Sequence, residues 1–181
     1  RHNGQMCNSL RGVIAHSSIY EKLIKHLKDK LPNLPIGSPH LSNSRIGALI
    51  SGTSTRASSL VNEATAKAKN IYNFSIKNNV VSPTLILNPD TQSSIISESI
   101  FAPILWVKEV KNHLEAISFY NKKNRHGLSF SVFSQDEKVS SDFTKHIRAG
   151  RININKHPLK GGVWDPLGGI RLSGYGGPRY W

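Results

Sequence analysis

Sulfur-containing and acidic residues are scarce in this 181-residue chain. It has one cysteine and one methionine, and 11 Asp and Glu against 24 Lys and Arg. The single cysteine, Cys7, excludes an intrachain disulfide. No apolar run approaches the roughly 20 residues that a membrane span needs, and the N-terminus lacks the apolar stretch of a secretory signal. We therefore expect a cytoplasmic protein with no membrane partner and no metal site, and with enough residues for one sizeable core.

The excess of basic residues gives a formal net charge of +13. Clustered Lys and Arg bind nucleic-acid phosphates, but here the lysines are spread over separate predicted helices, without interleaved aromatics. Lys22, Lys25, Lys28 and Lys30 share one such helix. We interpret them as solvated helix faces and expect no nucleic-acid partner.

Cys7 follows a Gly-Gln pair and precedes the apolar run of residues 13–15. A cysteine attacks only as the thiolate, so a catalytic thiol needs nearby hydrogen-bond donors, which the backbone amides around a glycine turn can supply. A single cysteine is also commonly a small buried hydrophobic residue. On its own, this motif leaves both interpretations open.

Strand and helix patterns alternate along the chain. Strands are predicted at residues 11–16, 84–87, 104–110, 128–133 and 151–155, and helices at 19–30, 54–69, 112–122 and 136–147. Ser17 or Ser18 is predicted to cap the first helix. This order predicts an α/β fold of three layers, with a largely parallel sheet and helices on both faces.

Several segments in a fixed order resemble the C-terminal catalytic region of the aldehyde dehydrogenase superfamily. They are Gly-Gln-Met-Cys at 4–7, Glu-Ser-Ile-Phe-Ala-Pro at 98–103, the Asn to Gly-Leu stretch at 121–128, Ala-Gly to Asn at 149–155, and Pro-Leu-Gly-Gly to Ser-Gly at 166–174. The resemblance implies that Cys7 is the nucleophile, which forms a thiohemiacetal and then a thioester while hydride passes to NAD or NADP. It also implies that Phe101 packs near the nicotinamide; without the family, Phe101 is equally a core residue.

The loops resemble two subgroups that oxidise aldehydes with a distant carboxylate. Residues 4–11 and 172–180 look like glutamate-semialdehyde (1-pyrroline-5-carboxylate) dehydrogenases of proline metabolism, and residues 155–162 look like succinylglutamate-semialdehyde dehydrogenases. Gly161 and Gly162 would present backbone N–H groups to that carboxylate, unless they form only a tight turn. Asn8, next to the nucleophile, stands where the first subgroup carries serine, and we expect it to contact substrate.

Departures from the family pattern support an alternative function. Ser99 stands where the family carries the acidic residue that holds a cofactor ribose hydroxyl, and Glu98 is one place away; Ala102 and Leu167 replace a glycine and a phenylalanine. A serine cannot supply the two acceptor oxygens of a carboxylate. The alternative is a degenerate, non-catalytic module for binding or assembly.

The chain begins inside a motif, so residues 1–181 are interpreted as one catalytic domain at the C-terminal end of a longer polypeptide. The resemblance then places the dinucleotide-binding domain, and most of the NAD or NADP pocket, outside this chain. A cysteine without cofactor and general base is not expected to turn over alone. The expected partners are a small-molecule aldehyde and further copies of the same chain in a homo-oligomer.

Overall fold

The computed structural model describes residues 2–38, 40–66, 70–157 and 168–175. The chain divides into two compact units, Arg1–Lys111 and Asn112–Trp181. The elements of the first unit are η1 (His2–Gly4), β1 (Gly12–His16), α1 (Ser17–Lys30), η2 (Leu31–Asn33), α2 (Thr53–Thr65), β2 (Ile71–Tyr72), β3 (Ile76–Lys77), β4 (Val80–Val81), β5 (Thr84–Leu87), α3 (Ser94–Ser97) and β6 (Ile104–Val110). Those of the second are α4 (His113–Lys123), β7 (His126–Gly127), β8 (Ser129–Val132), α5 (Glu137–His146), β9 (Arg151–Ile154) and β10 (Ile170–Arg171).

A four-stranded sheet in the order β1-β6-β5-β2 forms the centre of the first unit. Strands β1, β6 and β5 are parallel, and β2 pairs with β5 in the antiparallel direction. Gly12 lies beside Trp106, so two segments far apart in sequence become neighbours. Because β1 and β6 run in the same direction, the loops that precede them meet at the amino edge of this sheet.

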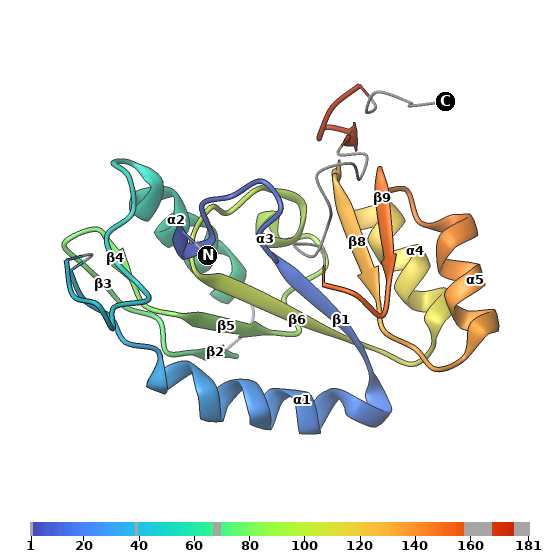
Figure 1. Cartoon of the computed structure of the whole chain (residues 1–181), viewed down its shortest axis with the longest axis horizontal. Coiled ribbons are helices and arrows are strands. Elements are labelled where there is room, and N and C mark those ends of the chain that lie inside the picture. Colours follow the sequence, from blue (N-terminus) through green and yellow to red (C-terminus); the bar gives the residue numbers. More distant parts are fainter. Residues whose placement is uncertain (1, 39, 67–69, 158–167, 176–181) are drawn as a thin grey trace. The chain divides into compact units, whose positions relative to one another are not determined.

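Helices cover both faces of the four-stranded sheet. In Figure 1, α1 lies along one face, and α2 and α3 lie on the other. Tyr20 and Ile24 of α1 form a buried cluster with Ala15, Leu85 and Val107 of the strands. The predicted three-layer α/β architecture is therefore confirmed, and the edge strand β2 is an addition that the sequence did not predict.

Helix α1 begins at Ser17, earlier than predicted, and its cap differs from the prediction. The N-cap is His16, whose ring Nδ1 accepts a hydrogen bond from the Ser18 amide at 3.2 Å. Neither Ser17 nor Ser18 is the cap, because both already lie inside the helix. The extended residue before the helix is His16, which is also the last residue of β1. An imidazole nitrogen satisfies one of the first amides as a serine oxygen would.

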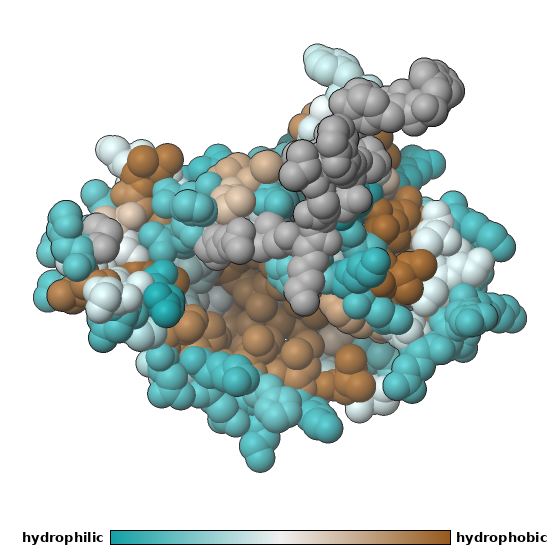
Figure 2. Space-filling model, viewed as in Figure 1, coloured by the Kyte–Doolittle hydropathy of each residue, from teal (hydrophilic) through white to brown (hydrophobic). Residues whose placement is uncertain are grey.

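Three of the four lysines of α1 are exposed to solvent, and the fourth lies against the edge of the sheet. Lys22, Lys25 and Lys30 are exposed, and hydrophilic side chains gather over this helix in Figure 2. Lys28 is half-buried, with its Nζ 5.8 Å from the centre of the Tyr72 ring. The interpretation as a solvated helix face agrees with the placement of Lys22, Lys25 and Lys30 but not with that of Lys28.

The second unit pairs β8 and β9 in parallel, with α4 and α5 packed together. Asn112 and Asp136 cap the two helices through side-chain oxygens. Tyr120, Phe130 and Phe143 form an aromatic cluster, with the Phe130 ring 4.9 Å from Tyr120 and 5.6 Å from Phe143. The predicted strands and helices of this unit are confirmed to within one or two residues, and the short antiparallel pair of β7 and β10 was not predicted.

Among the described residues, no helix is both long enough and apolar enough to span a membrane.

Candidate active site

The cysteine lies in a short loop before β1, which we call the thiol loop (residues 2–11). Cys7 is exposed and forms no disulfide. It lies in a turn closed by a hydrogen bond from the Ser9 amide to the Met6 carbonyl at 3.0 Å. The interpretation of Cys7 as a small buried hydrophobic residue is therefore wrong, because this turn projects the thiol away from the core.

The start of the thiol loop needs a glycine at position 4. Gly4 has φ +80°, and a Cβ there would collide with the carbonyl group of Ala102. Only glycine allows both this backbone conformation and this close approach. Gly4 therefore holds the thiol loop against the loop of residues 98–103, which precedes β6 and which we call the Phe101 loop.

Two side chains of the thiol loop bind the segment that precedes α2. The Asn3 amide donates to the Gly47 carbonyl at 3.2 Å and accepts from the Gly47 N–H at 3.3 Å. The Gln5 side-chain oxygen accepts from the Ile50 N–H at 3.1 Å. These contacts fix the loop through its polar groups and leave Cys7 open.

Phe101 stands out from its loop. Phe101 is 41% exposed, between the buried residues Ile100 and Ala102. Its backbone is left-handed, with φ 53°, which is rare for a bulky residue. The interpretation of Phe101 as a plain core residue is wrong, and its open ring lies on the loop that Gly4 contacts.

Two arginines bind the start of the Phe101 loop. Arg11 donates to the Glu98 carbonyl. Arg56 donates from Nε to the Ser99 carbonyl at 3.4 Å, and its terminal nitrogen lies 3.4 Å from the Glu98 carboxylate. The carboxylate that the sequence places one position from the family's acidic residue is thus paired with Arg56. Position 99 itself is a serine, as the sequence shows, and carries no carboxylate.

Asn8, the other predicted contact of substrate in this loop, is half-buried. Within the described part of the chain, its side-chain oxygen Oδ1 is buried and has no hydrogen-bond partner. Gly161 and Gly162 lie outside the described residues. Asn155, which follows β9, has φ 51° and exchanges two hydrogen bonds of 2.9 Å with the backbone of Ser134.

The sequence did not predict the hydrogen bonds of three side chains that hold the two loops, which are Asn3, Gln5 and Arg56. Gln5 stands inside the quoted motif, so its role had a signal. Asn3 lies one residue before that motif and Arg56 lies in no motif, and both bind backbone atoms more than 40 positions away.

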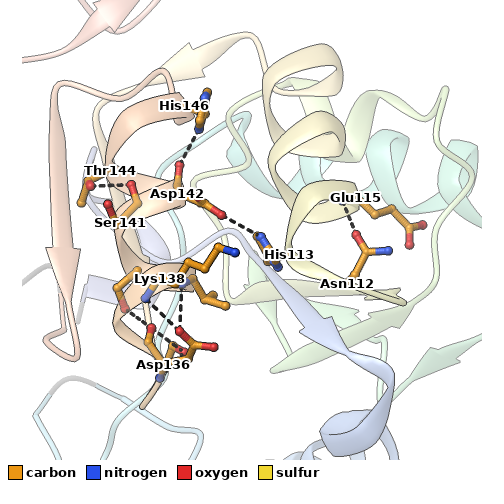
Figure 3. A network of polar contacts seen from close by, with 12 residues as sticks. Asn112, His113, Glu115, Asp136, Lys138, Ser141, Asp142, Thr144 and His146 are labelled. Atoms are coloured by element: carbon orange, nitrogen blue, oxygen red, sulfur yellow. Dashed lines mark hydrogen bonds and ion pairs between the residues drawn. The ribbon is translucent and has the colours of Figure 1, made fainter.

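A separate network of polar contacts lies in the second unit (Figure 3). His113 Nε2 is 3.0 Å from the Asp142 carboxylate, and His146 Nδ1 is 2.9 Å from the Asp142 carbonyl oxygen. The contact of His113 with Asp142 joins α4 to α5, and the contact of His146 lies within α5. No group of three or more His, Cys, Asp or Glu that could hold a metal ion occurs in the ranges that the structure describes.

Comparison with known proteins identifies relatives of this chain. Lactaldehyde dehydrogenase of Methanococcus maripaludis is 29% identical over 174 residues, which cover 96% of this chain and 37% of that protein. The NADP-dependent glyceraldehyde-3-phosphate dehydrogenase of Streptococcus equinus is 29% identical over 177 residues, covering 97% of this chain and 37% of its own. The chain therefore spans a little over a third of the length of these relatives.

Solved structures agree. Glyceraldehyde-3-phosphate dehydrogenase of Bacillus halodurans, solved with NADP, has a TM-score of 0.90 at 26% identity, over 97% of this chain and 37% of that one. Lactaldehyde dehydrogenase of Escherichia coli has a TM-score of 0.88 at 26% identity, over 97% and 38%. The model of the aldehyde dehydrogenase family matches residues 1–180. With an open thiol and an open aromatic ring on adjoining loops, this chain belongs to the aldehyde dehydrogenase family.

Proposed function

We propose that this chain is the thiol-bearing catalytic domain of an aldehyde dehydrogenase that oxidises a small aldehyde to its acid with NAD or NADP. The observation that carries the proposal is the exposed Cys7 on a loop locked against the Phe101 loop. The family resemblance gives these two residues their roles, and the structure supports them because both side chains are open where the loops adjoin.

The chemistry follows from the thiol. As the thiolate, the Cys7 sulfur adds to the aldehyde carbon, a C–S bond forms, and the electron pair of the C=O bond moves to oxygen. The backbone amide of Cys7 is the donor that we expect to stabilise this oxyanion. Loss of hydride from the same carbon leaves a thioester on Cys7, which water hydrolyses to the acid and the free thiol.

The exposed ring of Phe101 fits a role in packing against a nicotinamide. When bound, the cofactor accepts the hydride that leaves the aldehyde carbon. Ser99 would hold it by a hydroxyl instead of by a carboxylate. We propose that the rest of the dinucleotide pocket belongs to a domain outside residues 1–181.

For the substrate, we propose an aldehyde derived from an amino acid, with a carboxylate remote from the carbonyl group. The support is the sequence of the thiol loop and the pair Gly161 and Gly162, whose backbone amides would bind that carboxylate. Asn8 is proposed to contact the substrate beside Cys7. The relatives named for lactaldehyde and glyceraldehyde 3-phosphate offer two competing substrates.

The test measures NAD(P)H formation by the full product of the gene with glutamate semialdehyde, lactaldehyde and glyceraldehyde 3-phosphate. Cys7→Ala is expected to lower kcat by about a thousandfold or more, with unchanged circular dichroism. Alkylation by iodoacetamide before the assay is the chemical counterpart, with modification of Cys7, the single cysteine of residues 1–181, followed by mass spectrometry. Turnover that survives both treatments would remove Cys7 from the mechanism.

Ser99 favours one second candidate, a degenerate module that binds or assembles without catalysis. That candidate predicts that the full gene product gives no heat of binding with NAD or NADP in calorimetry. A measurable heat would contradict it. Assembly into a homo-oligomer and location in the cytoplasm stay predictions.

A further inference from the structure

One stretch of chain, residues 46–63, contacts both loops of the candidate site, and we call it the framing segment. Its first part binds the thiol loop, through Gly47 to Asn3 at 3.2 and 3.3 Å and through Ile50 to Gln5 at 3.1 Å. It then continues without interruption into α2.

The second part of the framing segment binds the chain that leads to Phe101. Glu63 accepts a hydrogen bond from the Ser94 amide at 2.7 Å. Arg56 binds the Ser99 carbonyl and the Glu98 carboxylate, both at 3.4 Å. Helix α2 thus forms hydrogen bonds with both ends of the segment of residues 94–99.

The framing segment is itself anchored. The α2 side chains of Ala57, Val61 and Ala64 are fully buried. At the start of the helix, the Ser54 hydroxyl donates to the Asn79 side-chain oxygen at 2.8 Å. The backbone that carries Arg56 is therefore fixed, although the guanidinium group is exposed to solvent.

The left-handed backbone of Phe101 explains why the Phe101 loop needs these contacts. A non-glycine residue in that conformation is strained and persists only when its surroundings hold it. Gly4 meets the loop on the far side of Phe101, at Ala102, and the two arginines hold it on the near side, at Glu98 and Ser99. Phe101 lies between these two supports.

We propose that Arg56 is a positioning residue, which holds the Phe101 loop in the conformation that presents the ring beside the thiol loop. This inference rests on the proposed function for its consequence in catalysis. Arg56 binds Glu98 and Ser99, and it acts on the ring through these two residues. The role needs two donors from one planar group, which lysine does not have.

The first experiment tests the position of the loop without activity, on the 181-residue chain. Chymotrypsin cleaves after exposed phenylalanines, so mass spectrometry reports the rate of cleavage between Phe101 and Ala102. We expect Arg56→Ala to raise this rate about threefold, the population shift that corresponds to loss of an exposed ion pair. Arg56→Lys should restore it incompletely.

The matched control is Arg45→Ala, which removes the same charge from an exposed arginine in the loop before α2. It should leave the rate at that of the original chain. Equal rates in Arg56→Ala and Arg45→Ala, including no cleavage in either, would overturn the positioning role. Arg56 is exposed, so its replacement leaves the core intact.

The second experiment uses the full gene product and separates binding from turnover. Arg56→Ala should raise KM for the nicotinamide cofactor about threefold and change kcat less than about twofold, because loop order is lost and the nucleophile stays. An unchanged KM with a lowered kcat would overturn the role. If the unmodified protein forms no NAD(P)H, the proposed function fails, and the cleavage rates still decide the role of Arg56.

Discussion

The two loops of the candidate site and the packed layer of the second unit differ in backbone conformation and in the exposure of their side chains. In the loops, His2, Asn3, Gly4 and Phe101 all have positive φ, and the side chains of Cys7 and Phe101 are open. In the second unit, α4 and α5 carry regular caps and pack through an aromatic cluster in which Phe130 of β8 contacts both Tyr120 and Phe143.

The difference follows from what each region must do. A side chain that is buried stabilises its own position, whereas a nucleophile and a cofactor platform must remain open to small molecules. The loops are therefore held through backbone and polar contacts, such as Asn3 with Gly47 and Gly4 with Ala102. Changes in the packed layer should thus alter stability, and changes in the loops should alter chemistry.

The largest effect on stability is expected from Phe143→Ala. Phe143 is 7% exposed and stacks on Phe130, so its removal leaves a cavity and should lower the free energy of unfolding by about 3–5 kcal/mol. Urea denaturation followed by circular dichroism measures this. Phe133→Ala is the matched control, because Phe133 is 68% exposed and its loss should cost less than about 0.5 kcal/mol. Equal losses in the two variants would show that the aromatic cluster does not stabilise the unit.

A smaller loss of stability, with a large loss of chemistry, is expected from Gly4→Ala. The added methyl group meets the Ala102 carbonyl at a residue with φ +80°, which should cost about 2 kcal/mol and displace the thiol loop. Displacement of a reacting group by about 1 Å lowers rates by about a hundredfold, so NAD(P)H formation by the full gene product should fall by that order.

Gly52→Ala separates the two causes. Gly52 also has φ +80°, but a Cβ there meets no atom within 4 Å. It should therefore carry the backbone strain alone, at about 1 kcal/mol, with unchanged activity. An equal loss of activity in both variants would contradict the fit of Gly4 against Ala102.

Much of the fold could be predicted because its main elements carry strong periodic patterns. Residues 104–107 are an apolar run that follows a proline, and Leu114, Ile117 and Phe119 recur along the predicted helix at 112–122; the structure confirms the strand and the helix. The pairs β3–β4 and β7–β10 were missed, because a strand of two residues has no period to read. They form where distant segments supply hydrogen bonds.

The residues of the candidate site likewise divide into those that the sequence predicted and those that it did not. Cys7 and Phe101 could be found because they stand inside motifs of local sequence. Arg56 could not, since nothing near it in sequence indicates that Glu98 and Ser99 fold against α2. The amino edge on which the two loops meet also needed the pairing of β1 with β6, which a sequence pattern does not specify.

The smallest effect concerns the sheet that carries the loops, through Tyr20 of α1. Burial, followed by the charges of Glu109 and Glu21, raises the pKa of Tyr20 above its usual value of 10.0, and the hydrogen bond from Asn88 lowers it by less. The neutral phenol is thus favoured in the folded chain. Its contribution to stability is fully present below about pH 10 and is lost as pH rises through the raised pKa.

The free energy of unfolding should therefore fall more steeply above about pH 10 in the original chain than in Tyr20→Phe. At neutral pH, the same variant should lose about 1 kcal/mol, because the Asn88 amide loses the acceptor that lies 3.1 Å away. Tyr175→Phe, at an exposed position, is the control and should keep the original profile. If Tyr20→Phe shows the same alkaline slope as the original chain, the burial of this phenol does not set the pH limit, and the support beneath the site loops must be sought in the apolar contacts of Ile24 and Val107 alone.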